Sequence, residues 1–184
     1  MAKVIPNYLE DKLCFQISDW ASDWYRNSGS KPLYTTGAPK IVSNVPMTPT
    51  GKLRRWVDLN KVHCPYLAAV TNKLFSEFKL EQYYQGSILN YYIPGTKVGL
   101  HAHKLDTGKA DLRFNILVQK PQIGGNPIVD NVTYCLNQTD LLIFDARKPH
   151  KTDAVEGTKD RILLSCIFVV PDTNTHCHPD TLQP

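Results

Sequence analysis

Two stretches of the chain carry apolar residues at steps of three and four, the spacing of an amphipathic helix. Residues 8–27 are predicted to form the first helix, which ends before Ser28-Gly29-Ser30-Lys31-Pro32. Residues 65–78 are predicted to form the second, with Pro65 in its first turn. The segment between them, residues 32–60, is rich in Pro, Gly and Thr. We expect substrate loops there, with short strands at 40–45 and 53–59.

After residue 80 the pattern changes to short runs of β-branched and aromatic residues, separated by Gly, Pro, Asn and Asp. The predicted strands cover residues 83–93, 97–103, 112–119, 126–129, 132–136, 141–144 and 161–170. Two helices followed by a series of strands predict a mainly β protein. We expect an antiparallel barrel or jelly roll with the N-terminal helices packed on one side.

The length of 184 residues predicts a single domain. Within it, residues 1–80 are expected to form the helical support and substrate loops, 81–170 the β-barrel core, and 171–184 a loose tail. The chain is 42% hydrophobic and 21% charged, as in ordinary globular proteins. No apolar run approaches the roughly 20 residues that span a bilayer, and the N-terminus lacks the core of a signal peptide. We therefore expect a cytoplasmic protein without a membrane partner.

The charge and the cysteines agree with this expectation. A net charge of +4 is mild for a nucleic-acid binder, so nucleic acid is a possible partner but not the favoured one. The densest basic cluster holds Lys52, Arg54 and Arg55 beside Trp56; it is either a contact for an anionic substrate or a solvated loop. The five cysteines are scattered, which predicts reduced and mostly buried thiols.

Three histidines are the candidate metal ligands. His101 and His103 lie two residues apart at the end of a predicted strand, so their side chains share a face. His150 is expected on a loop after the strand at 141–144, and strand ends can meet at one mouth of a barrel. Three such ligands with open positions suit Fe(II). The His-x-His step alone is weak evidence, because the tail repeats it at His176 and His178; surface or satisfied core histidines are the alternative.

Two arginines are expected to face the barrel interior. Arg161 shares a strand face with Leu163 and Ser165, while Ile162, Leu164 and Cys166 pack outward. Arg113 likewise shares a face with Asn115. A buried guanidinium needs a partner, and a ligand carboxylate held by two hydrogen bonds is a natural one. The structural alternative for each arginine is a salt bridge to Asp140 or Asp145.

These residues, in this order, resemble the Fe(II)/2-oxoglutarate-dependent dioxygenases over residues 89–170. The run Asn90-Tyr91-Tyr92-Ile93-Pro94-Gly95 followed by His101 is similar to a segment of the AlkB-like members. The resemblance implies a double-stranded β-helix, the jelly-roll or cupin-like fold. It also implies that Asn90 and Tyr92 bind 2-oxoglutarate (2OG), that His101 and His150 bind iron, and that Arg161 holds the distal carboxylate of 2OG.

Two further features belong to the same resemblance. The pattern of these dioxygenases continues from Arg161 to Ser165, which places the Ser165 hydroxyl with the cosubstrate residues. The run Leu112-Arg113-Phe114-Asn115 is similar to one in the aspartyl/asparaginyl hydroxylases, where the arginine also serves the cosubstrate. The family resemblance as a whole is to AlkB-like and to prolyl and aspartyl hydroxylase-like members.

One residue departs from the pattern. The resemblance expects Asp or Glu where this chain has His103, so the site would carry three histidines and one more unit of positive charge. We favour His103 as the third ligand. Alternatively Asp106 is the carboxylate ligand, or it orients His103.

The resemblance implies an Fe(II)- and 2OG-dependent oxygenase that hydroxylates or demethylates its substrate by oxidative decarboxylation of 2OG. The expected partners are O₂ and a small molecule, an amino acid or a peptide, and the expected state is a monomer or homodimer. One alternative is a three-histidine cupin-like metal dioxygenase that uses no 2OG. The other is a non-catalytic jelly-roll binding module.

Overall fold

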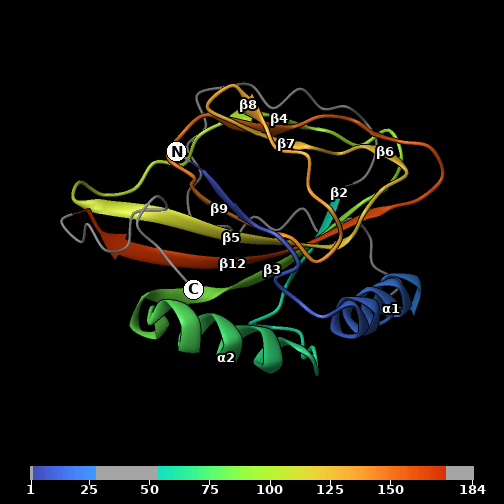
Figure 1. Cartoon of the computed structure of the whole chain (residues 1–184), viewed down its shortest axis with the longest axis horizontal. Coiled ribbons are helices and arrows are strands. Elements are labelled where there is room, and N and C mark those ends of the chain that lie inside the picture. The colour runs from blue at the N-terminus through green and yellow to red at the C-terminus, as the bar shows by residue number, and fades with distance from the viewer. Residues whose placement is uncertain (1, 28–53, 173–184) are drawn as a thin grey trace.

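A computed structural model describes residues 2–27 and 54–172 of the chain (Figure 1). The helices are α1 (Asp11–Asn27), α2 (Leu67–Phe78) and the short 3-10 helix η1 (Glu81–Tyr83). The strands are β1 (Lys3–Ile5), β2 (Arg54–Asp58), β3 (Tyr84–Tyr92), β4 (Val98–His101), β5 (Lys109–Gln119), β6 (Ile123–Gly124), β7 (Pro127–Val129), β8 (Val132–Thr133), β9 (Leu141–Asp145), β10 (His150–Thr152), β11 (Val155–Glu156) and β12 (Arg161–Pro171).

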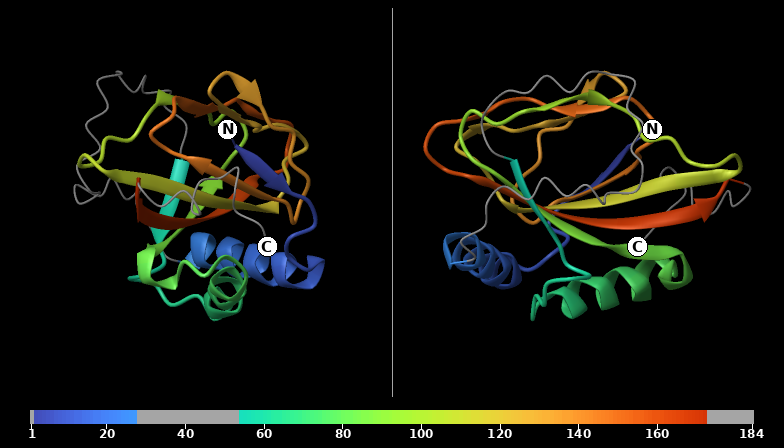
Figure 2. Two further views of the ribbon diagram at one scale, coloured as in Figure 1. Left: turned by 60° about the vertical axis from the view of Figure 1, so that its left-hand side comes forward. Right: turned by 180° about the vertical axis from the view of Figure 1, so that it is seen from behind.

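The strands form two facing antiparallel sheets and a small third one. The large sheet has the order β1-β9-β5-β12-β3-β2, the second sheet β4-β10-β7-β8, and the third pairs β11 with β6. Figures 1 and 2 show the two larger sheets stacked over each other, with α1 and α2 on the outer face of the large sheet. This is the mainly β, jelly-roll architecture with helices on one side that the sequence predicts.

Alternation along the central strand β12 divides the molecule into two apolar regions. Ile162, Leu164 and Cys166 belong to the core between the large sheet and the helices. Leu163 belongs to a smaller cluster between the two sheets, and Arg161 and Ser165 line a cavity there. Successive side chains of a strand point to opposite faces, so one strand builds the core and the site together.

Helix α2 is held on the large sheet by aromatic contacts. The Phe78 ring lies 5.1 Å from that of Phe114 on β5, and Phe114 lies 4.8 Å from Phe168 on β12, as measured between ring centroids. Phe114 and Phe168 are almost fully buried. The helix ends at Lys79, which adopts the left-handed conformation (φ 56°) and donates its backbone N–H to the carbonyl of Phe75.

Several element boundaries differ from those predicted. Helix α1 begins at Asp11 rather than at residue 8, because Asn7 has a positive φ of 52° and the N–H groups of Tyr8 and Leu9 donate to the carbonyl of Thr139. Helix α2 begins at Leu67, so Pro65 precedes the helix instead of lying in its first turn. His150 begins strand β10 and does not lie on a loop.

Four short strands were not predicted: β1, β6, β10 and β11. The strand β8 is shorter than the predicted 132–136 and ends at Thr133. Strands β1 and β2, which come from the first 80 residues, pair with β9 and β3 and thereby complete the large sheet. The predicted strand at 40–45, the tail beyond Asp172 and Lys52 of the basic cluster lie outside the described residues.

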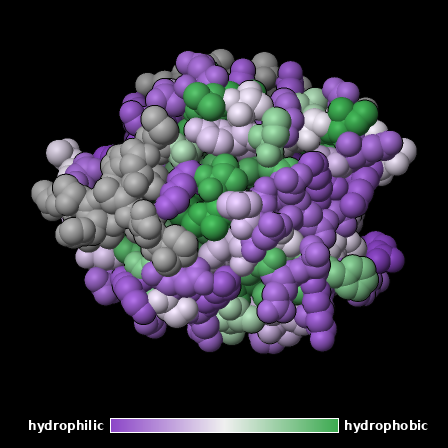
Figure 3. Space-filling view, viewed as in Figure 1, coloured by the Kyte–Doolittle hydropathy of each residue, from purple (hydrophilic) through white to green (hydrophobic). Residues whose placement is uncertain are grey.

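The face of the described part shown in Figure 3 is mainly hydrophilic. Figure 3 shows one face on which hydrophilic residues predominate and a few hydrophobic ones gather near the middle. Among the described helices, none is long and apolar enough to cross a lipid bilayer. The thiols of Cys14, Cys64 and Cys166 are buried and that of Cys135 is exposed, and all four are free.

Candidate metal centre

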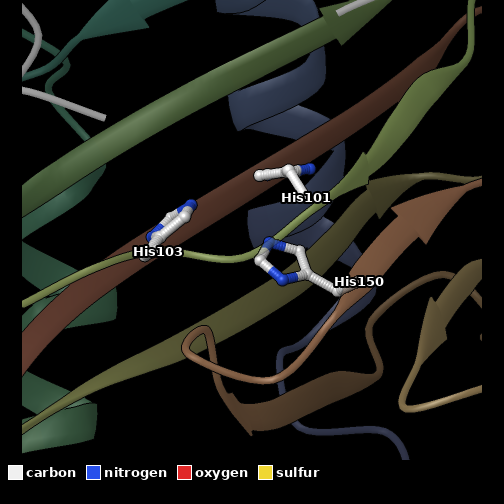
Figure 4. A group of neighbouring side chains, drawn as sticks. All are labelled: His101, His103 and His150. Carbon is white, nitrogen blue, oxygen red and sulfur yellow. The ribbon is translucent and has the colours of Figure 1, made fainter. Parts of the chain in front are cut away.

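Three histidine rings gather between the two larger sheets. His101 ends β4 and His150 begins β10, and the two residues are directly paired across these antiparallel strands. His103 follows two residues after His101 (Figure 4). Each ring offers one nitrogen such that the three nitrogens lie within 4.8 Å of one another. The His101 and His150 rings are the closest pair, with centroids 4.1 Å apart.

The Nδ1 atom of each ring already has a neighbour within hydrogen-bond distance. That of His101 lies 2.9 Å from the carbonyl oxygen of Gly99, and that of His150 lies 2.8 Å from the carbonyl oxygen of Lys148. That of His103 lies 2.7 Å from Oδ2 of Asp111. An acceptor at Nδ1 places the proton there and leaves the Nε2 lone pair for a metal. The carbonyl acceptors favour this tautomer for His101 and His150. At His103 the Nη2 atom of Arg113 also lies 3.0 Å from Nδ1, and the carboxylate of Asp111 is within reach of both nitrogens.

The surroundings favour a neutral His150 and an ionised Asp111. Burial, together with repulsion from His101, His103 and Arg113, lowers the pKa of His150 to about 3. Burial by itself would raise the pKa of Asp111, but hydrogen bonds from His103 and Arg113 and the charge of Arg113 outweigh it, and the pKa lies below its usual value. At neutral pH His150 therefore offers a metal an uncharged ring nitrogen, and Asp111 is ionised.

A cavity of about 100 Å³ is lined by the three histidines and by residues of the large sheet. This volume exceeds several-fold what a single water molecule needs. The wall opposite the histidines carries polar side chains from three strands of the large sheet. They are Asn90 and Tyr92 on β3, Arg113 and Asn115 on β5, and Arg161 and Ser165 on β12.

Arg161 is the largest buried polar side chain of this wall, with 1% of its surface exposed. Its guanidinium carbon lies 5.0 Å from the centre of the Tyr92 ring, and the two residues are paired across β12 and β3. Gly125 leaves the room that Arg161 needs: a Cβ at this position would lie 2.8 Å from Cδ of Arg161, and its φ of +69° also favours glycine. Arg161 thus lines the cavity as a cation on a tightly packed stem.

The structure brings together most of the residues that the sequence singled out. The three histidines and the five expected cosubstrate residues Asn90, Tyr92, Arg113, Arg161 and Ser165 all line the cavity. Asp106 does not join them, because its side chain is 88% exposed and its carboxylate lies 3.5 Å from Nζ of Lys109. In the basic cluster, Arg54 and Trp56 stand opposite Tyr92 and Asn90 in the register of β2 and β3.

Arg113 has a different partner from the two expected as alternatives. Its Nη2 atom donates to Oδ2 of Asp111 at 2.7 Å. Asp145 pairs with Arg147 instead, and Asp140 accepts hydrogen bonds from the backbone N–H groups of Asn7 and Asn137.

Asp111 is the residue of the site that the sequence reasoning missed. The strand was predicted to begin at residue 112, whereas β5 begins at Lys109. Extending the alternation of Arg113 and Asn115 by one step toward the N-terminus places Asp111 on the same face. The alternation of side chains along this strand is therefore the sequence signal that identifies Asp111.

Solved structures show what this architecture resembles. A viral collagen prolyl hydroxylase from Paramecium Bursaria Chlorella virus-1, in complex with 2OG, superposes with a TM-score of 0.59 over 92% of this chain and 96% of its own, at 13% identity. A Trichoplax adhaerens prolyl hydroxylase is bound to a fragment of the hypoxia inducible factor oxygen degradation domain. It superposes with a TM-score of 0.61 over 91% of this chain and 82% of its own, at 16% identity.

A third similar structure, the non-heme alpha ketoglutarate dependent epimerase SnoN from nogalamycin biosynthesis, gives a TM-score of 0.62 over 91% of this chain and 75% of its own, at 11% identity. The chain has the double-stranded β-helix fold of these enzymes. No family model and no curated protein matches the sequence. The resemblance seen in the motifs therefore extends to the fold across nearly the whole chain.

Proposed function

We propose that this protein is an Fe(II)- and 2OG-dependent oxygenase. The observation that carries the proposal is the placement of His101, His103 and His150 across one cavity from the buried Arg161, in the fold of 2OG-dependent enzymes. A metal facing a cation over a cavity of this kind suits a cosubstrate that chelates at one end and carries a carboxylate at the other. 2OG is such a molecule.

The residues present fit an iron ion. Imidazole nitrogens suit Fe(II), and three ligands on one side of the metal leave positions for exchangeable groups. The hydrogen bonds at Nδ1 keep each ring turned toward the centre. When bound, Fe(II) supplies activation of O₂, coupled to oxidative decarboxylation of 2OG to succinate and CO₂.

The wall of the large sheet would bind the other end of 2OG. Arg161 holds a fixed fork of N–H donors in a site with 1% exposure, so a carboxylate there would form charge-assisted hydrogen bonds away from water. Ser165 lies four residues further along β12 on the same face and adds a hydroxyl, while Asn90 and Tyr92 add an amide and a phenol from β3. Positioning and charge are the contributions of the protein.

Spectroscopy with metal and cosubstrate alone tests this proposal. Anaerobic addition of Fe(II) and 2OG should give a weak visible charge-transfer band. Arg161→Ala should abolish the band at cosubstrate concentrations that saturate the wild type, Arg161→Lys should retain part of it, and both should still bind Fe(II). Arg26→Ala, at an exposed pair on α1, is the matched control and should leave the band unchanged.

Two results would contradict the proposal. The first is wild-type protein that binds Fe(II) but gives no band with 2OG; turnover with Fe(II) and O₂ alone would then favour the cupin-like dioxygenase that needs no cosubstrate. The second is wild-type protein that binds no metal, which would favour the non-catalytic module.

The substrate is proposed as a peptide, an amino acid or another small molecule. The prolyl hydroxylases named above act on prolyl residues and one is bound to a peptide fragment, whereas SnoN is an epimerase of nogalamycin biosynthesis. Substrates thus differ widely on this fold, and the fold does not choose among them. A screen for succinate release with amino acids, proline-containing peptides and alkylated oligonucleotides would distinguish these classes.

A further inference from the structure

Among the three histidines, His103 has a different environment from the other two. The Nδ1 atoms of His101 and His150 face backbone carbonyl oxygens, which are neutral acceptors. The Nδ1 atom of His103 faces the carboxylate of Asp111 at 2.7 Å. His103 is also the residue that stands where a two-histidine-one-carboxylate site has its acid. A charged acceptor, Asp111, thus lies behind His103, the ligand that departs from the two-histidine-one-carboxylate pattern.

The position of Asp111 is tightly determined. The backbone N–H of His103 donates to the carbonyl of Ala146, and the N–H of Ala146 donates to the carbonyl of Asp111, at 2.9 Å and 2.7 Å. Ala146 therefore links the segment after β4 to β5 through two backbone hydrogen bonds. The Asp111 side chain is 4% exposed and that of His103 14% exposed, so their contact is shielded from water.

Arg113 lies at the same contact. Its Nη2 atom lies 2.7 Å from Oδ2 of Asp111, the oxygen that faces His103, and 3.0 Å from Nδ1 of His103. A buried carboxylate without a cation is costly, so Arg113 allows Asp111 to remain ionised at this depth. A carboxylate that accepts the Nδ1 proton of a ligating histidine makes that ring a stronger electron donor to the metal.

On the basis of the proposed function, we propose that Asp111 acts through His103 to supply the negative charge that a ligand carboxylate supplies in two-histidine-one-carboxylate sites. His103 and Asp111 together then take the place of the third ligand. Asp111 is a positioning residue that does not touch the metal. Arg113 belongs to this unit, because its Nη2 atom lies within hydrogen-bond distance of both Asp111 and His103.

Metal binding in the absence of 2OG and O₂ tests the inference. Asp111→Asn keeps the shape of the side chain but removes its charge, and it should weaken Co(II) binding about 10- to 100-fold. It should also raise the Fe(III)/Fe(II) midpoint potential, because loss of a negative charge destabilises Fe(III) more than Fe(II). Asp130→Asn, at an exposed turn after β7, is the matched control and should change neither quantity.

Repeating Asp111→Asn in a second variant shows whether Asp111 supplies charge to the metal site or only supports its structure. In the His103→Asp variant the carboxylate is itself the ligand, so adding Asp111→Asn should change Co(II) affinity by less than about threefold in that background. An equal loss in both backgrounds, or wild-type affinity and potential in Asp111→Asn, would overturn the inference while leaving the proposed function intact. Wild-type protein that binds no Co(II), Fe(II) or Zn(II) would overturn both.

A measurement on the unaltered protein covers the case in which Asp111→Asn does not fold. In Zn(II)-loaded protein with ¹⁵N-labelled histidine, the Nδ1-bound proton of His103 should resonate well downfield of those of His101 and His150, because charge-assisted hydrogen bonds are shorter and stronger. Three protons at similar shifts would contradict the inference.

Discussion

At the scale of single residues, the site depends on what stands behind each ligand as much as on the ligand itself. The Nδ1 atom of His103 faces a side-chain carboxylate, whereas those of His101 and His150 face backbone carbonyl oxygens. Asp106, which is closer to His103 in the sequence than Asp111 is, points to solvent and Lys109. Distance along the chain is therefore a poor guide to which acid serves the cluster.

This difference predicts opposite outcomes for two substitutions. Asp106→Asn should leave anaerobic Fe(II) or Co(II) affinity unchanged, because its carboxylate is solvated and remote from the cluster. His103→Ala should weaken it by at least about tenfold through loss of a ligating nitrogen. Isothermal titration of both variants measures this. A large loss in Asp106→Asn with none in His103→Ala would identify Asp106 as the third ligand.

At the scale of elements, the sequence predicts the long strands well and the short ones poorly. Strands β3, β5 and β12 have 9 to 11 residues, so the alternation of their side chains between two faces can be recognised over several repeats. Strands β6, β10 and β11 have two or three residues, too few for a period of two to stand out. Their pairing is also remote: Val155 of β11 pairs with Gly124 of β6.

In the site too, the residues on long strands are predictable from the sequence and the contacts made by short strands and loops are not. The face alternation of β5 and β12 predicts that Arg113, Arg161 and Ser165 line the interior, as they do. The pairing of His101 with His150 depends on the antiparallel contact of β4 and β10, which involves residues about 50 positions apart in the sequence. The approach of Asp111 to His103 depends on the loop between β4 and β5, whose path no local pattern specifies.

The contact between α2 and the large sheet gives a stability prediction at this scale. Phe114→Ala should lower the free energy of unfolding by about 3–5 kcal/mol, because it leaves a cavity between the rings of Phe78 and Phe168. Phe15→Ala on α1 is the matched control. Its side chain is 68% exposed, and the change should stay within about 0.5 kcal/mol. Urea denaturation measures both, and equal effects would contradict the assignment of the core.

At the scale of the whole molecule, the metal centre joins two strands of the smaller sheet to the segment that leads to the large sheet. His101 and His150 lie on adjacent strands of the smaller sheet, and His103 lies on the segment that leads back to the large sheet. A metal held by all three would fix this segment against both sheets. Binding to the folded state alone also stabilises it by mass action.

Metal addition should therefore raise the thermal midpoint of unfolding. At a free concentration about 100 times the dissociation constant, Co(II) should add about 2.7 kcal/mol of stability. A chelator should reverse the shift, and His150→Ala should abolish it. Mg(II), which prefers oxygen ligands, should have no effect on the wild type. A Co(II) shift that survives His150→Ala would place the metal elsewhere.

The alternation of β12 has a consequence for folding. A slip of one residue in its pairing would move Arg161 and Ser165 into the apolar layer under the helices and Ile162 and Leu164 into the cavity. An unpaired guanidinium in that layer would cost several kcal/mol, so a misregistered sheet is strongly disfavoured. The polar residues that suit the site for a ligand thus also discriminate against misfolding, and a single-residue insertion within 161–166 would abolish folding and function together.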